Sequence, residues 1–191
     1  MVRIAILASG SGSNAEEIIR FIKGVRQVEV ASVVTNHPEA GVIERVKLYG
    51  IPVQLFVKKD WKTSELILSY FEKLKIDLIV LAGYLQKIPD YLIKEFPDKI
   101  VNIHPALLPS YGGKGMYGMN VHEAVHRNRE KFSGITIHLV NENYDEGEII
   151  FQARCPIHPD DTPEQIRTNV LALEHQYYPT IVKYLALGLT N

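Results

Sequence analysis

The chain has 191 residues, of which 46% are hydrophobic and 23% are charged, and its formal net charge is −1. This composition is typical of a globular protein and excludes an intrinsically disordered chain. The balanced charge also argues against a nucleic acid or an anionic membrane as a partner, so an anionic ligand must be held locally. We expect one domain over 1–191, either a monomer or a homodimer.

Three further features bear on the compartment. The apolar start of the chain ends in a glycine-serine turn and not in a cleavage site, so we expect no export signal. No apolar stretch approaches the roughly 18 residues of a membrane span. The single cysteine, Cys155, can form no internal disulfide. We therefore expect a cytoplasmic protein.

Apolar runs alternate with helical patterns along the first half of the chain, which is typical of βαβ units and a mostly parallel sheet. Strands are expected at 2–8, 28–35, 53–57 and 77–83, and helices at 13–24, 41–49 and 63–75. Ser13 followed by Glu16 has the spacing of a capping box, which predicts that Ser13 caps the first helix.

The second half continues the pattern with helices at 90–96 and 120–128 and strands at 99–104, 134–141 and 148–155. The segment NENYDEGE joins the last two strands and is either a hairpin or a functional loop. A long final helix begins at Thr162, and Pro179 is expected to kink or interrupt it. These elements predict an α/β, Rossmann-like fold: an open, twisted, mostly parallel sheet of about seven strands with helices on both faces.

A glycine-rich loop, SGSGSNA, follows the first expected strand at residues 9–15 and fits the pattern G-x-G-x-x-A. Such a turn directs backbone N–H groups and a helix N-terminus at an anion. A dinucleotide site would need an acid at the end of the second strand, roughly 20 residues further on, but Glu29 lies near the start of that strand. We therefore favour a phosphate on Gly12, Ser13 and Asn14. A dinucleotide site and a purely structural turn remain alternatives.

The segment HEAVH, from His122 to His126, matches the H-E-x-x-H pattern of zinc metalloproteases. No third ligand follows at a familiar spacing, and charged residues surround the short helix. An exposed amphipathic turn explains the pattern better, so we expect no metal.

Asn102 and His104 are polar residues in an otherwise apolar strand that ends at Pro105. Residues two apart in a strand share one face, and ligands of parallel sheets gather beyond the carboxyl ends of the strands. An asparagine amide can donate to a developing oxyanion and a histidine can donate a proton, so the pair suits a tetrahedral intermediate of acyl transfer. The alternative is a pair of core polar residues bonded to nearby backbone.

The sequence offers no nucleophile of its own for such a reaction. There is no G-x-S-x-G motif, and Cys155 lies inside an apolar strand. The attacking group would then belong to a substrate. A carboxylate beside the histidine would raise its pKa; Asp145 is one candidate, and the sequence alone does not select it over Glu142, Glu146 or Asp160.

Taken together, the motifs LASGSGSN, DLIVLAGY, NIHPALLPSY, SGITIHLVNENYDEGEII and LEHQYYP, in this order, resemble those of the phosphoribosylglycinamide formyltransferases over essentially the whole chain. The resemblance implies transfer of a formyl group from 10-formyltetrahydrofolate, as co-substrate, to the amine of glycinamide ribonucleotide in purine biosynthesis, without a metal. It implies the catalytic set Asn102, His104 and Asp145.

The resemblance also implies binding and support residues. Gly12, Ser13 and Asn14 match the family's phosphate site, and Glu174 matches the acid that holds the ribose hydroxyls. Support roles are expected for Thr136 and His138. The folate is expected to contact two segments, largely through backbone groups: Leu85, Gln86, Lys87 and Ile88 in one, and Asn141, Glu142, Asn143 and Tyr144 in the other.

Two departures from the family are visible. Gln86 stands where family members often carry arginine, and the glycine-rich segment 112–118 lengthens the link before His122, which suggests a mobile loop.

Formyltetrahydrofolate hydrolase and a non-catalytic nucleotide-binding module remain alternative functions.

Overall fold

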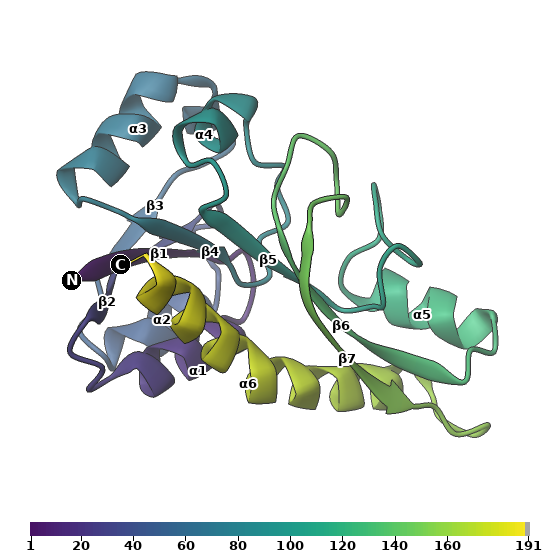
Figure 1. The fold of residues 1–191 in the computed structure, drawn as a ribbon. Helices are drawn as coiled ribbons and strands as arrows, with labels where there is room; N and C mark the ends of the chain where they lie inside the picture. The colour runs from purple at the N-terminus through teal and green to yellow at the C-terminus, as the bar shows by residue number, and fades with distance from the viewer. Residues whose placement is uncertain (190–191) are drawn as a thin grey trace. The chain divides into compact units, whose positions relative to one another are not determined.

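The computed structural model describes residues 1–189, which form two compact units. Of the described residues, the first unit contains 1–101 and 179–189, and the second contains Asn102–Tyr178, so the boundary falls inside one strand, β5 (Ile100–His104). Within the described residues seven strands follow the order β3-β2-β1-β4-β5-β6-β7 (Figure 1). The predicted α/β class and its strand number are confirmed, while the single domain over 1–191 stays a prediction.

The first unit contains the parallel strands. These are β1 (Val2–Leu7), β2 (Val28–Thr35), β3 (Val53–Leu55) and β4 (Leu78–Leu81), and the pairs β1–β2, β1–β4 and β2–β3 are parallel. Strands β1, β2 and β4 are buried almost throughout, which explains their continuous apolar sequences. Helices α3 (Ser64–Lys73) and α4 (Asp90–Glu95) lie on one face, and α1 (Ser13–Ile22) and α2 (Val42–Lys47) on the other (Figure 1). A 3-10 turn at Asp60–Lys62 was not predicted.

The capping box predicted at the start of α1 is wrong. Gly12, with φ 77°, is the N-cap, and Ser13 is already helical. The Glu16 carboxylate does not turn back to the helix start, because it forms an ion pair with Arg45 and accepts a hydrogen bond from the Tyr49 hydroxyl at 2.8 Å. These interactions lower the pKa of Glu16, with the Arg45 hydrogen bond as the largest cause. A tertiary contact with α2 has therefore replaced the local one.

The second unit contains the antiparallel pair β6 (Phe132–Leu139) and β7 (Ile149–Pro156), helix α5 (Met119–Arg127) and most of α6 (Pro163–Gly188). The pairing runs from Phe132 opposite Pro156 to Ile137 opposite Phe151, with an irregularity between Ile137 and His138. NENYDEGE is therefore the connection of an antiparallel hairpin.

Helix α6 continues through Pro179 to Gly188, so the predicted interruption there is wrong. A proline inside a helix removes one N–H donor but need not end the helix when packing holds both sides. Both Tyr178 and Pro179 are buried. No helix within residues 1–189 is long and apolar enough to span a membrane.

Candidate active site

Strand β5 presents two polar side chains at its carboxyl end. Asn102 and His104 share one face, and the strand ends where Pro105 follows. His104 is 4% exposed, so its imidazole must find partners inside the protein.

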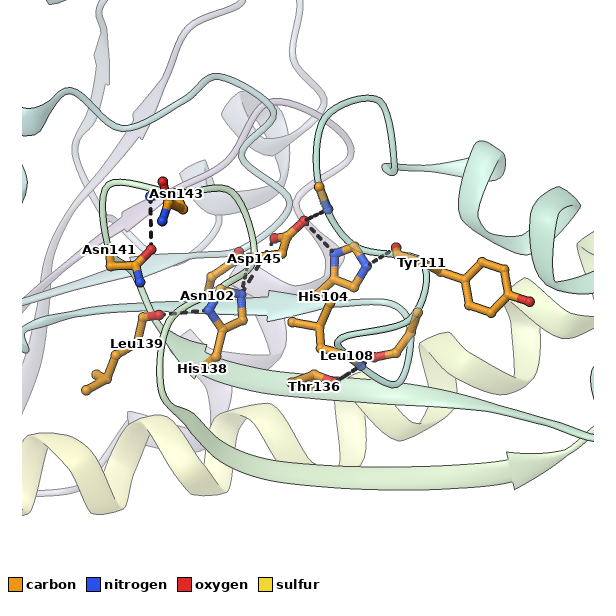
Figure 2. A network of polar contacts seen from close by, with 12 residues as sticks. Asn102, His104, Leu108, Tyr111, Thr136, His138, Leu139, Asn141, Asn143 and Asp145 are labelled. Atoms are coloured by element: carbon orange, nitrogen blue, oxygen red, sulfur yellow. Dashed lines mark hydrogen bonds and ion pairs between the residues drawn. The ribbon is translucent and has the colours of Figure 1, made fainter.

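Both ring nitrogens of His104 have a partner in the second unit. Nε2 donates a hydrogen bond to the backbone oxygen of Tyr111 at 2.7 Å, and Nδ1 lies 3.6 Å from Oδ2 of Asp145 (Figure 2). A carbonyl oxygen can only accept, so Nε2 keeps its proton whether the ring is charged or neutral. The proton that His104 can lose is therefore the one on Nδ1, on the side of Asp145.

Burial lowers the pKa of His104 below its ordinary value of 6.5. The Asp145 charge and the Tyr111 carbonyl raise this pKa, while His138 lowers it, and the net direction is downward. The expectation that a carboxylate would favour the imidazolium is thus right for the contribution of Asp145 but wrong for the net effect, because desolvation of a buried cation is larger.

Asp145 is the acid that the structure places beside the strand residues. Its side chain is 13% exposed and lies between two imidazoles, since His138 Nε2 is 3.7 Å from its Oδ1 (Figure 2). The three other candidates are all exposed: Glu142, Glu146 and Asp160.

The carboxylate of Asp145 also accepts a hydrogen bond from the Gly113 N–H at 2.9 Å. Burial alone would raise the pKa of Asp145, but the neighbouring imidazoles of His138 and His104, together with the Gly113 N–H, bring it below its ordinary value of 3.8. Asp145 is therefore a carboxylate at neutral pH.

His138 connects Asn102 to Asp145. Its Nδ1 donates to the backbone oxygen of Leu139 at 2.8 Å, which makes Nε2 the acceptor in the neutral ring. Nε2 then accepts from Nδ2 of Asn102 at 3.1 Å. This bond fixes the amide plane of Asn102 and uses one of its two N–H groups. The other N–H can donate to a substrate oxygen.

The loop after His104 is held by Thr136 and by Gln152. Thr136 was expected to have a support role, whereas no sequence pattern indicated Gln152. The Thr136 hydroxyl donates to the Ala106 oxygen at 2.6 Å and accepts from the Leu108 N–H at 2.9 Å. Gln152 lies opposite Thr136 in the β6–β7 ladder, and its Nε2 donates to the Thr136 hydroxyl at 2.8 Å and to the Leu108 oxygen at 3.0 Å. The contacts of Thr136 and His138 support the roles expected for them, which stay predictions.

The glycine loop lies in the first unit, between β1 and α1. A Cβ on Gly12 would lie 2.5 to 2.7 Å from Val42 atoms, including its backbone, and the positive φ independently favours glycine. Arg45 donates to the Ser11 oxygen at 2.9 Å, so helix α2 holds the loop. Ser13 and Asn14 are the first two residues of α1, which leaves a helix N-terminus beside the loop.

The remaining predicted residues divide between the two units. Leu85 is bonded to the glycine loop, because its N–H donates to the Ser9 hydroxyl at 3.0 Å. In the second unit, Asn141 accepts from the Asn143 N–H at 3.0 Å, and Glu174 lies on α6. Exposure separates the others: Lys87, Glu142, Asn143 and Tyr144 are exposed, Gln86 is half-buried, and Ile88 is buried.

The two histidines of the HEAVH segment have opposite environments. His122 is 3% exposed, and burial lowers its pKa to about 4, while His126 is exposed. In the part of the chain that the structure describes, residues 1–189, no three histidine, cysteine or acidic side chains are arranged so that they could hold a metal ion.

A family model described as formyl transferase matches residues 2–182. The chain belongs to the formyl transferase family. It is 42% identical over 188 residues to a chloroplastic phosphoribosylglycinamide formyltransferase of Vigna unguiculata, and 37% identical over 196 residues to the Bacillus subtilis protein of the same name. A crystal structure of phosphoribosylglycinamide formyltransferase from Bacillus halodurans superposes with a TM-score of 0.86 at 39% identity, covering 96% of this chain and 94% of that one.

These relatives differ in how much of their length the chain matches. The match covers 96% of this chain but 60% of the Vigna protein, and 100% of this chain and 97% of the Bacillus subtilis protein. The family resemblance that the sequence motifs indicated is confirmed.

Proposed function

We propose that this chain transfers a formyl group from 10-formyltetrahydrofolate to the amine of glycinamide ribonucleotide, in purine biosynthesis in the cytoplasm. The observation that carries the proposal is the cluster Asn102, His104, His138 and Asp145, in which the Asp145 carboxylate lies between two imidazoles and the Asn102 amide is bonded to one of them, His138. The names of the relatives support the choice of substrates.

In the proposed reaction the substrate amine attacks the formyl carbon, and a new C–N bond forms as the carbonyl oxygen becomes an oxyanion. The free N–H of Asn102 donates to this oxygen. The bond from the formyl carbon to the folate nitrogen then breaks, and His104 supplies its Nδ1 proton to the departing nitrogen. The oxyanion returns to a carbonyl as this bond breaks. The attacking amine loses one proton to the Asp145 carboxylate, which passes it to the deprotonated Nδ1 of His104, so protons and charge balance.

The binding residues follow the family pattern. We assign the phosphate to the N–H groups at Gly12, Ser13 and Asn14, the ribose hydroxyls to Glu174, and the folate to two segments, 85–88 and 141–144. Neutral Gln86 cannot pair with the folate's glutamate tail as an arginine would. Lys87 is a nearby cation, and its Nζ lies 3.7 Å from Oδ1 of Asp90. A monomer or a homodimer is proposed as the functional form.

The direct test mixes the protein with 10-formyltetrahydrofolate and follows loss of the formyl group with and without glycinamide ribonucleotide. We expect turnover that depends on the amine and yields formylated product. Turnover without the amine would indicate a hydrolase, and no turnover at all would refute the enzyme proposal.

Asn102→Ala is expected to lower kcat by about 10²- to 10³-fold, the usual cost of removing one oxyanion donor. Asn102→Asp keeps the shape and should be as inactive, because a carboxylate repels the oxyanion. Steady-state kinetics give the comparison, with Asn169→Ala, which changes an exposed asparagine of α6, as the control. Equal rates for Asn102→Ala and the wild type would remove Asn102 from the mechanism.

Gly12→Ala is expected to raise KM for glycinamide ribonucleotide at least tenfold and to lower the melting temperature. The added Cβ meets the backbone and side chain of Val42, so either the loop or α2 must move. Gly24→Ala is a matched control, because Gly24 also has positive φ but no atom within 4 Å of the added Cβ. If the two variants show the same KM, the glycine loop does not hold the substrate.

A further inference from the structure

The turn from Tyr111 to Gly113 provides backbone groups to two catalytic candidates at once. The Tyr111 oxygen accepts from His104 Nε2 at 2.7 Å, and the Gly113 N–H donates to Asp145 Oδ2 at 2.9 Å (Figure 2). Because the two groups are two residues apart, a shift of this turn would displace the partners of His104 and Asp145 together.

The backbone of this turn adopts unusual conformations. Tyr111 has φ 59°, a region that non-glycine residues rarely occupy, and Gly113 has φ 90°. At Gly112 an added Cβ would lie 2.6 Å from the Leu108 side chain and 3.3 Å from Cβ of Asp145, so the turn packs closely on the aspartate. A tyrosine held in the left-handed region needs a specific anchor.

The phenol of Tyr111 has such an anchor. Its hydroxyl donates to Oε1 of Glu130 at 2.7 Å and accepts from Nδ2 of Asn128 at 2.9 Å. Asn128 follows α5, and Glu130 lies between α5 and β6. The side chain is thus bonded to the α5–β6 connection while its backbone oxygen contacts the catalytic histidine.

We propose that Tyr111 is a positioning residue for formyl transfer: its phenol, bonded to Glu130 and Asn128, holds its backbone oxygen against His104 Nε2. The reactive proton is thereby confined to Nδ1, on the side of Asp145. This inference rests on the proposed function. It also explains two glycines of segment 112–118: Gly112 allows the close approach to Asp145, and Gly113 adopts a φ of 90° that favours glycine.

The charged and titratable groups near His104 come from several segments. Asp145 faces Nδ1, His138 lies on the far side of Asp145, and His122 on α5 is close enough for its own pKa to be affected by His104. Two of the neighbours of His104 raise its pKa, namely the charge of Asp145 and the backbone carbonyl of Tyr111. Loosening the carbonyl contact should therefore move the alkaline limb of the kcat profile to lower pH, since less imidazolium remains.

The first test is Tyr111→Phe, which removes the hydroxyl and keeps the ring. We expect kcat to fall by about fivefold to tenfold with KM for both substrates within about twofold, the size of effect of one lost hydrogen bond. Tyr117→Phe is the matched control, because Tyr117 is an exposed tyrosine of the same loop. Its kcat and pH profile should match those of the wild type.

The second test separates the anchor from the tyrosine itself. Glu130→Ala should reproduce the kinetics of Tyr111→Phe, and Glu130→Gln, which keeps an accepting oxygen, should restore most of the rate. The double variant Tyr111→Phe with Glu130→Ala should be no slower than either single variant, because both remove the same bond. Additive losses would contradict a shared anchor.

The third test needs no turnover. ¹⁵N NMR of the histidine rings should show His104 protonated on Nε2 in the neutral wild type, and a lower His104 pKa with a mixed tautomer in Tyr111→Phe. An unchanged tautomer, pKa and kcat in Tyr111→Phe would overturn the proposal. If the wild type transfers no formyl group, the proposed function fails, but the NMR comparison still decides whether the anchor positions the His104 ring. If Tyr111→Phe does not fold, Glu130→Ala provides the same measurements.

Discussion

His104→Ala is expected to lower kcat for formyl transfer by about 10²- to 10⁴-fold, the contribution of a positioned general acid, and to leave the protein folded. The substitution leaves the Tyr111 oxygen without its donor, at a cost of about 1 to 3 kcal/mol in the free energy of unfolding. Circular dichroism and a thermal melt measure the fold, and steady-state kinetics measure the rate. Unfolding of the variant would indicate that the histidine is a structural core residue.

The exposed His126 on α5 offers the control, and His126→Ala should retain the wild-type rate. The stability of the two variants should also differ in its pH dependence. The pKa of His104 is below 6.5 in the folded state, so the unfolded chain binds more protons between the two values and stability rises with pH in that interval. The wild type should therefore lose stability as the pH falls below about 6.5, and His104→Ala should lack this contribution.

Local patterns were sufficient for the position of Asn102 and His104. Their two-residue spacing, and the proline that ends β5, placed both side chains on one face at the carboxyl end of the strand, where parallel sheets bind ligands. The continuous apolar sequences of β1 and β2 likewise predicted buried parallel strands. Periodicity and edge rules act over a few residues, so the sequence displays them directly.

Contacts between distant segments could not be predicted in the same way. Asp145 was one of four candidate acids until the hairpin placed it between two histidines, and the backbone groups of Tyr111 and Gly113 have no residue-type signal. The predicted cap at Ser13 was wrong for a related reason, because Arg45 on another helix holds Glu16. In each case a tertiary contact determined what the local pattern left open.

Asp145→Asn is expected to lower kcat by about 10³- to 10⁴-fold, as for other carboxylates that sit behind a catalytic histidine. In the wild type, the negative charge of Asp145 raises the pKa of His104. The amide keeps the size of the side chain but removes this charge. Without it the pKa of His104 falls further, less imidazolium is available near neutral pH, and the alkaline limb of the kcat profile moves to lower pH. The amide can also donate to a histidine nitrogen and disturb the neutral tautomers.

Glu146→Gln is the matched control, since Glu146 is an exposed acid of the same hairpin connection that lies outside the proposed folate segments, and its loss should leave kcat and the pH profile unchanged. Stability provides an independent readout. The pKa of Asp145 is lowered in the folded state, so its carboxylate contributes stability above pH 3.8 that is lost as the pH falls through the lowered value. Asp145→Asn should therefore be less stable than the wild type at neutral pH, with the difference narrowing in acid. If the alkaline limb of the kcat profile lies at the same pH in Asp145→Asn as in the wild type, the charge of Asp145 does not act on His104. The proton transfer must then be assigned to another group.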